Sequence, residues 1–151
     1  MAGGFTIKKD NIILFKNFLI KNFKKTQLEN SEMINLYLDS IISPSALNED
    51  FCSDIEKLAP FGSGNNEPKF VIEDLKVISS RIVANNHIKS ILIGKDGTVF
   101  KAFSWNSKNS PLEHFLNKKN KKKINIAGKM RLNEWKGKKD IEFLIEDISI
   151  N

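Results

Sequence analysis

The order of predicted elements in residues 70–151 is the feature that most constrains the fold. Five segments there alternate apolar and polar residues, and one segment has the periodicity and the Ser-Pro start of a helix. The predicted strands are 70–83, 87–94, 98–105, 123–132 and 140–150, and the predicted helix is 110–119. The first strand alternates imperfectly, which is typical of a bulge or a strong bend. The order is therefore three strands, one helix and two strands.

This order is that of the OB-fold, a five-stranded Greek-key barrel with its helix between the third and fourth strands. The last hairpin offers an internal test of that prediction. A two-residue turn at Lys136-Gly137 pairs Leu132 with Ile141, Met130 with Phe143, Gly128 with Ile145, and Arg131 with Glu142. The first three pairs make one apolar face and the fourth brings opposite charges together on the other face, as a barrel wall requires.

The Asp96-Gly97 dipeptide is a strong signal for another two-residue hairpin turn. Such a turn places Ser90, Leu92, Lys101, Phe103 and Trp105 on one face, and Ile91, Ile93, Phe100 and Ala102 on the other. The first set is the better binding surface because it carries a cation and two aromatic rings. A register slip of one residue would exchange the faces, so this assignment depends on the turn type.

Residues 1–69 read differently, with a short strand at 3–7, a helix capped by Asp10, a strand at 35–42 and a second helix over 47–58. These elements are too few for a complete domain, so we expect the chain to begin inside one. The whole chain is predicted to be α+β.

The charge is unevenly distributed along the chain. Residues 1–68 hold 7 Lys/Arg and 9 Asp/Glu, whereas residues 69–151 hold 17 and 9, a net charge of +8. This asymmetry favours a polyanionic partner, nucleic acid above all, although AT-rich coding would also enrich lysine.

Cys52 is the only cysteine, which excludes an internal disulfide and a cysteine-based zinc site; its helical context predicts a small buried group. No apolar run is long enough for a membrane span and no signal peptide is visible, so we expect a soluble, cytoplasmic protein without a membrane partner.

Two motifs carry a resemblance to a known family. In LAPFGSGNNEPKF, a Pro-Phe-Gly-x-Gly-Asn-x-x-Pro-x-Phe element stands at 60–70, and an Asn-x-Trp-x-Gly element stands at 133–137. With AGGFTI near the N-terminus, they resemble the C-terminal part of RecJ-type single-strand DNA exonucleases. The resemblance implies a remnant of the DHH-associated domain at 1–45, a helix and connector at 46–69, and an OB-fold at 70–151.

The same resemblance implies a parent 5′-to-3′ exonuclease of DNA recombination and repair, with manganese or magnesium in a DHH catalytic domain. The aspartates and histidines that bind metal in that family have no match here. We therefore expect the chain as given to hold no cofactor and to have no nuclease activity of its own.

Single-stranded DNA is bound by cations along the backbone path and by aromatic faces on which bases stack. OB-folds bind oligonucleotides over the second and third strands and through the loops after strands one and four. The candidate DNA-binding residues are Arg81, Lys89, Lys101, Phe103, Trp105, Lys129, Arg131, Trp135, Lys136, Lys138 and Lys139. Alternatively, Trp135 covers the end of the barrel, and isolated cations such as Arg81 and Lys89 are merely solvated.

Two hypotheses of function follow. In the first, the chain is the single-stranded DNA-binding module of a RecJ-type exonuclease. In the second, it is a docking module for the acidic tail of a partner such as a single-strand DNA-binding protein.

Overall fold

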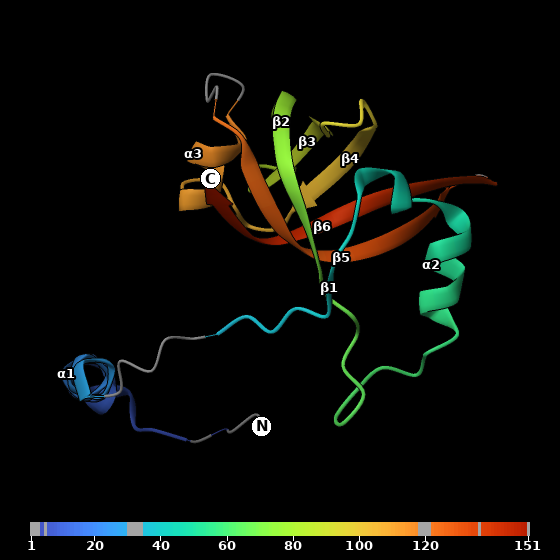
Figure 1. Ribbon diagram of the computed structural model, residues 1–151. Helices are drawn as coiled ribbons and strands as arrows, with labels where there is room; N and C mark the ends of the chain where they lie inside the picture. Colours follow the sequence, from blue (N-terminus) through green and yellow to red (C-terminus); the bar gives the residue numbers. More distant parts are fainter. Residues whose placement is uncertain (1–3, 5, 30–34, 118–121, 136, 151) are drawn as a thin grey trace. The chain divides into compact units, whose positions relative to one another are not determined.

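The computed structural model describes residues 4, 6–29, 35–117, 122–135 and 137–150, and for residues 23–29, 135 and 138 it describes the backbone only (Figure 1). The chain divides into two compact units, residues 1–36 and residues 37–151. The predicted boundaries after residues 45 and 69 stay predictions. None of the described helices is long and apolar enough to cross a membrane.

The first unit consists of a 3₁₀ turn, Lys9–Asn11, followed directly by α1, Ile12–Glu29. Asp10 was expected to cap the helix, but it lies inside the 3₁₀ turn. No strand forms at the described residues of the predicted segment 3–7. Several apolar side chains of α1 are exposed, including Ile13 at 73% and Phe18 at 59%.

The second unit is a β-barrel with short helices around it (Figure 1). Its strands are β1 Ser40–Ile41, β2 Phe70–Val83, β3 His87–Ile93, β4 Val99–Ser104, β5 Ile124–Trp135 and β6 Lys138–Ile150. Its helices are a 3₁₀ turn at Pro44–Ala46, α2 Glu49–Glu56 and α3 Pro111–Leu116. The strand order is β1-β2-β3-β4-β6-β5, and a further pairing of β2 with β5 closes the barrel. The predicted OB-fold, with its helix between the third and fourth barrel strands, is confirmed.

One predicted strand is much shorter than expected. Only Ser40–Ile41 of the segment 35–42 pairs, in parallel with the first two residues of β2. Residues 35–39 lie outside any strand, and Tyr37 is 83% exposed. Tyr37, Leu38 and Ile41 are exposed, and only Ile42 packs against the core, so the apolar pattern of NLYLDSII does not mark a core strand.

The long strand β2 bends at two register shifts, one between Ile72 and Leu75 and one between Val77 and Ser79. Asp74, inside the first shift, has a φ of 60°. The bends let one strand pair with β5 through its first half and with β3 through its second half, which is how a barrel closes. The bulge predicted from imperfect alternation is confirmed.

The β5–β6 hairpin has the predicted register: Leu132 opposes Ile141, Met130 opposes Phe143, Gly128 opposes Ile145, and Arg131 opposes Glu142. Gly128 sits at a register shift, and a Cβ there would lie 1.9 Å from the Leu144 carbonyl oxygen. Only glycine lets the two backbones approach so closely at this point.

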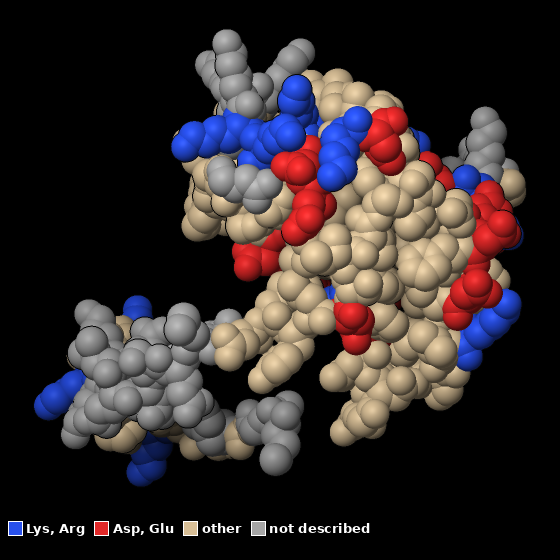
Figure 2. All heavy atoms as spheres, in the orientation of Figure 1, with Lys and Arg blue, Asp and Glu red and all other residues tan. Residues whose placement is uncertain are grey.

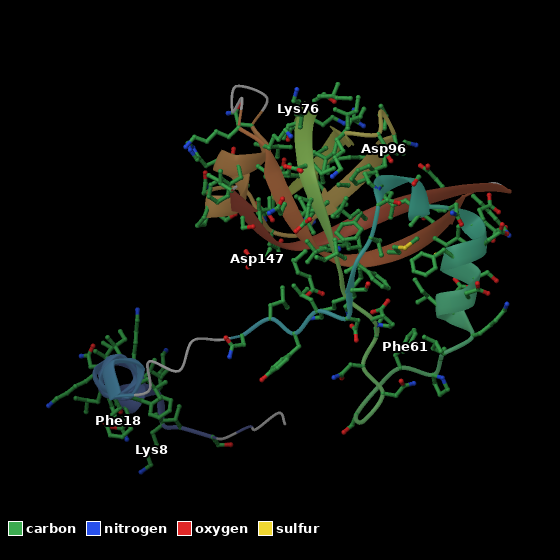
Figure 3. All side chains as sticks on the ribbon, in the orientation of Figure 1. Lys8, Phe18, Phe61, Lys76, Asp96 and Asp147 are labelled. Carbon is green, nitrogen blue, oxygen red and sulfur yellow. The ribbon has the colours of Figure 1, made fainter. Side chains whose placement is uncertain are left out.

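The β3–β4 hairpin differs from the prediction by one residue. Ile93 pairs with Val99, and the Gly94 amide donates to the Thr98 carbonyl at 3.0 Å, which leaves a three-residue loop at 95–97. Gly97 ends this loop with a φ of 83°, and Asp96 at its tip accepts a hydrogen bond from the Thr98 amide (Figure 3). That hydrogen bond lowers the pKa of Asp96. The loop is the glycine-ended three-residue type, not the predicted two-residue turn.

The connector between α2 and β2 is held by its own amides and by packing. Asn65 Nδ2 donates to the carbonyls of Leu58 at 2.9 Å and Pro60 at 3.1 Å. Phe70 is buried, and its ring lies 5.5 Å from that of Phe51 in α2. These contacts give the segment LAPFGSGNNEPKF a structural role, because they order the connector and anchor its end in the core.

Cys52, on the inner side of α2, is 4% exposed and belongs to the core of the barrel unit. Burial raises the pKa of its thiol, and the nearby Glu56 carboxylate raises it further. A protonated, buried thiol is inert, so the prediction of a structural cysteine is confirmed.

Candidate nucleic-acid interface

Residues that are paired across neighbouring strands form rows on the barrel, and each row crosses β2, β3, β4, β6 and β5 in that order. The first row is Arg81, Lys89, Phe103, Leu144 and Lys129, and the second is Ser79, Ile91, Lys101, Glu142 and Arg131. The row between them contains Ser90, Ala102 and Phe143, all buried. Paired residues in neighbouring strands share a face, so the two outer rows form one continuous surface.

This arrangement corrects the predicted faces of the β3–β4 hairpin. Ser90 and Leu92 were expected beside Lys101 and Phe103, but they are 1% and 0% exposed and line the core. Lys89 and Ile91 take their place on the outer surface. The three-residue loop causes the change, because a shift of one residue moves every side chain of a strand to the other face.

An aromatic cluster forms where β4 ends. Trp105 is 55% exposed, and its ring centre lies 4.9 Å from that of Phe103 and 4.5 Å from that of His87. The His87 Nδ1 atom accepts a hydrogen bond from the Asn106 amide at 3.0 Å, which ties the segment after β4 to the start of β3. The exposed indole is therefore supported by two rings and a fixed turn.

A hollow of about 400 Å³ lies on the same outer surface, and one of its lining residues, Lys89, is paired with Phe103 of the cluster. Ser79, Ser80, Arg81, Lys89, Ile91 and Lys101 line it, so three cations and two hydroxyl groups surround an apolar side chain. The structure pairs Arg81 with no carboxylate among the residues it describes. The hollow suits an anionic group attached to an apolar or aromatic one.

Two lysines of the hollow are held by carboxylates of β6. Lys89 forms an ion pair with Glu142, which is only 7% exposed, and Lys101 Nζ lies 2.5 Å from an Asp140 carboxylate oxygen. The Lys101–Asp140 pair is much more open, with side-chain exposures of 46% and 42%. Arg131 opposes Glu142 in the register, but the carboxylate bonds Lys89 and not Arg131. Acidic side chains also lie beside basic ones on the side of the barrel shown in Figure 2.

Lys129 and Lys139 are engaged elsewhere. Lys129 Nζ lies 2.7 Å from Glu67 in the connector and 3.8 Å from Glu146, and Lys139 Nζ lies 4.0 Å from Glu49 in α2. These two predicted DNA-binding residues thus contact acids of the segment that precedes β2.

The family of the chain follows from residues 38–147, which match the model of the RecJ OB domain. The chain belongs to the RecJ OB domain family. Among curated proteins, none has a sequence that matches this chain.

Two solved structures of RecJ from Thermus thermophilus resemble this RecJ OB domain. The complex with Mn²⁺ matches with a TM-score of 0.54 and 19% identity, over 88% of this chain and 19% of that one. The complex with Mg²⁺ matches with a TM-score of 0.53 and 20% identity, over 87% of this chain and 20% of that one. The likeness shows the shared fold, and the chain spans about a fifth of the length of these relatives.

The structure brings together five of the predicted site residues of this RecJ OB domain, namely Arg81, Lys89, Lys101, Phe103 and Trp105. Lys136 and the side chains of Trp135 and Lys138 lie outside the described residues. DNA binding by any of the predicted residues stays a prediction.

Sequence reasoning missed His87 and Ile91 as members of this surface. His87 lies at the start of β3, next to the Ile88–Ser104 pair that ends the β3–β4 register, and this position could have indicated the ring cluster. In the part of the RecJ OB domain that the structure describes, no three His, Cys, Asp or Glu side chains gather as a metal site would require. The described side chains of this surface therefore offer stacking and charge.

Proposed function

We propose that this chain is the single-stranded DNA-binding module of a RecJ-type 5′-to-3′ exonuclease that acts in DNA recombination and repair in the cytoplasm. In this proposal the module holds the strand for a metal-dependent catalytic domain supplied from outside these residues. The chain itself contributes binding and no cleavage.

One observation carries the proposal: an exposed indole lies next to a hollow lined by three cations on the β3–β4 surface. Bases of any sequence can stack on an aromatic face, and phosphates need only positive charge nearby. The same β3–β4 surface is where OB-folds commonly bind oligonucleotides. Because such contacts position the strand without reading base edges, little sequence preference is expected.

Fluorescence anisotropy with labelled single-stranded and duplex oligonucleotides, at two salt concentrations, tests the proposal. We expect tighter binding of single strands and weaker binding at higher salt, because phosphate neutralisation releases counterions. Equal affinity for duplex, or no binding of a single strand at low salt, would contradict it.

A second function, the docking of an acidic partner tail, is favoured by one feature of the hollow. Ile91 provides an apolar side chain among the three cations, as an acidic peptide with an apolar residue would need. Binding of such a peptide without any affinity for oligonucleotides would establish this function in place of the first.

A further inference from the structure

The Lys101–Asp140 pair is more exposed than the Lys89–Glu142 pair of the same surface, and this difference matters for how a ligand could bind. Glu142 is buried beneath Lys89 and is a fixed part of the barrel wall. Asp140, in contrast, lies near the start of β6, and both it and Lys101 are more than two-fifths exposed. An exposed pair of this kind contributes little stability and exchanges partners readily.

Lys101 is placed so that, if it leaves Asp140, it can bind an anion in the hollow. Lys101 lines the hollow together with Arg81 and Lys89, and Arg81 is paired with no carboxylate among the described residues. A phosphodiester is an anion with at least two free oxygens, so it can take over Lys101 while it also contacts Arg81. Asp140 and such an anion would then compete for the same Lys101 ammonium group.

We propose that the hollow between β2, β3 and β4 is a subsite for one backbone phosphate of a single strand, and that Asp140 competes with this phosphate for Lys101. The inference rests on the proposed DNA-binding function and adds to it a ligand group, a site and a built-in competitor. The strand enters the subsite when Lys101 exchanges the carboxylate for the phosphate, while Lys89 stays with Glu142. The nucleotide beside that phosphate lies within reach of the Trp105 ring.

The test compares the wild type with Asp140→Asn, Lys101→Gln and the double variant, using anisotropy of a labelled oligothymidylate. Asp140→Asn keeps the shape of the side chain and removes the competing charge, so we expect about two- to five-fold tighter binding. Lys101→Gln should weaken binding, and Asp140→Asn should have no further effect in the Lys101→Gln background, because its influence passes through that lysine.

A matched control separates this mechanism from a general change of charge. Asp54→Asn removes the same charge from an exposed Lys–Asp pair, Lys57–Asp54 at 2.7 Å, at the C-terminal end of α2. It should leave the affinity unchanged. An equal gain from Asp54→Asn, or the same gain from Asp140→Asn with and without Lys101, would overturn the proposal.

Failure of the subsite and failure of the proposed function give different results. If the wild type binds single strands but Asp140→Asn does not strengthen binding, the competitor is refuted and the DNA-binding module stands. If no variant binds oligonucleotide, the proposed function fails as well. If Asp140→Asn strengthens the binding of a labelled acidic peptide alone, the hollow takes carboxylates and the phosphate subsite is wrong.

Discussion

The cations on the β3–β4 surface and those on β5 and β6 belong to one barrel, yet they have different partners. Lys129 reaches Glu67 in the connector and Lys139 lies 4.0 Å from Glu49 in α2, so both are paired with acids of the segment before β2. Lys89 and Lys101 are held by acids of β6 and lie beside an exposed aromatic cluster. The neighbours of a lysine, both its acidic partner and the rings beside it, therefore distinguish the two surfaces better than its place in a basic sequence does.

The largest expected effect is that of Trp105→Ala on single-strand binding. Loss of one stacked base costs about 1–3 kcal/mol, so the affinity should fall at least several-fold, as measured by fluorescence anisotropy. The thermal unfolding midpoint should change little because Trp105 is half exposed.

Trp105→Phe serves as the control and should retain much of the affinity, because it keeps an aromatic face. If Trp105→Ala bound as tightly as the wild type, Trp105 would not stack on a base. The β3–β4 surface would then be no better a candidate for DNA binding than the surface of β5 and β6.

A smaller effect is expected from Lys89→Met, and it falls on stability. The Glu142 carboxylate would lose its ion-pair partner while remaining buried, which should lower the free energy of unfolding by about 1–2 kcal/mol. Urea denaturation followed by tryptophan fluorescence measures the change.

Glu142→Gln in the Lys89→Met background should restore part of the loss, because it removes the unpaired charge. If the double variant were less stable than Lys89→Met, Glu142 would be held by groups other than Lys89.

The smallest effects should come from Lys101→Gln and Lys129→Gln, and the two should differ in kind. Each phosphate contact contributes about −0.7 to the slope of log K against log salt for single strands. Lys101→Gln should make that slope less steep by about this amount, whereas Lys129→Gln should leave it unchanged.

Lys129→Gln should instead lower stability by at most about 1 kcal/mol, as an exposed ion pair would. A flatter salt dependence in Lys129→Gln would show that Lys129 leaves Glu67 to contact the strand. Both surfaces would then contact DNA, and the contrast drawn between them would be wrong.

The sequence predicts the barrel well because its signals there are local and repeated. The alternation in 123–132 and 140–150, with a glycine in the turn, defines one register, and an apolar face exists only in that register. The β3–β4 hairpin shows the limit of this reasoning. The dipeptide Asp96-Gly97 suits both a two-residue and a three-residue loop, and only the packing of Ser90 and Leu92 into the core selects the second.

The candidate site was predicted in its residue types but not in its partners. Trp105, Phe103 and Lys101 stand close together in sequence, and alternation places them on one face. The acids that engage the lysines come from distant segments, as Glu67 does for Lys129 and Glu142 for Lys89. Periodicity within a strand contains no information about such long-range pairs, so the partners of these lysines became known only from the tertiary structure.

The pairing of β2 with both β3 and β5 also affects the order in which the barrel can fold during synthesis. Its second half can form a hairpin with β3 soon after synthesis, but its first half must wait for β5, which is translated much later. At about 5–20 residues per second, that delay lasts a few seconds, during which the edge of β2 that pairs with β5 in the barrel is unpaired. Phe70 and Ile72, buried in the finished barrel, are exposed in that interval, so a nascent chain arrested before β5 presents an aggregation-prone strand.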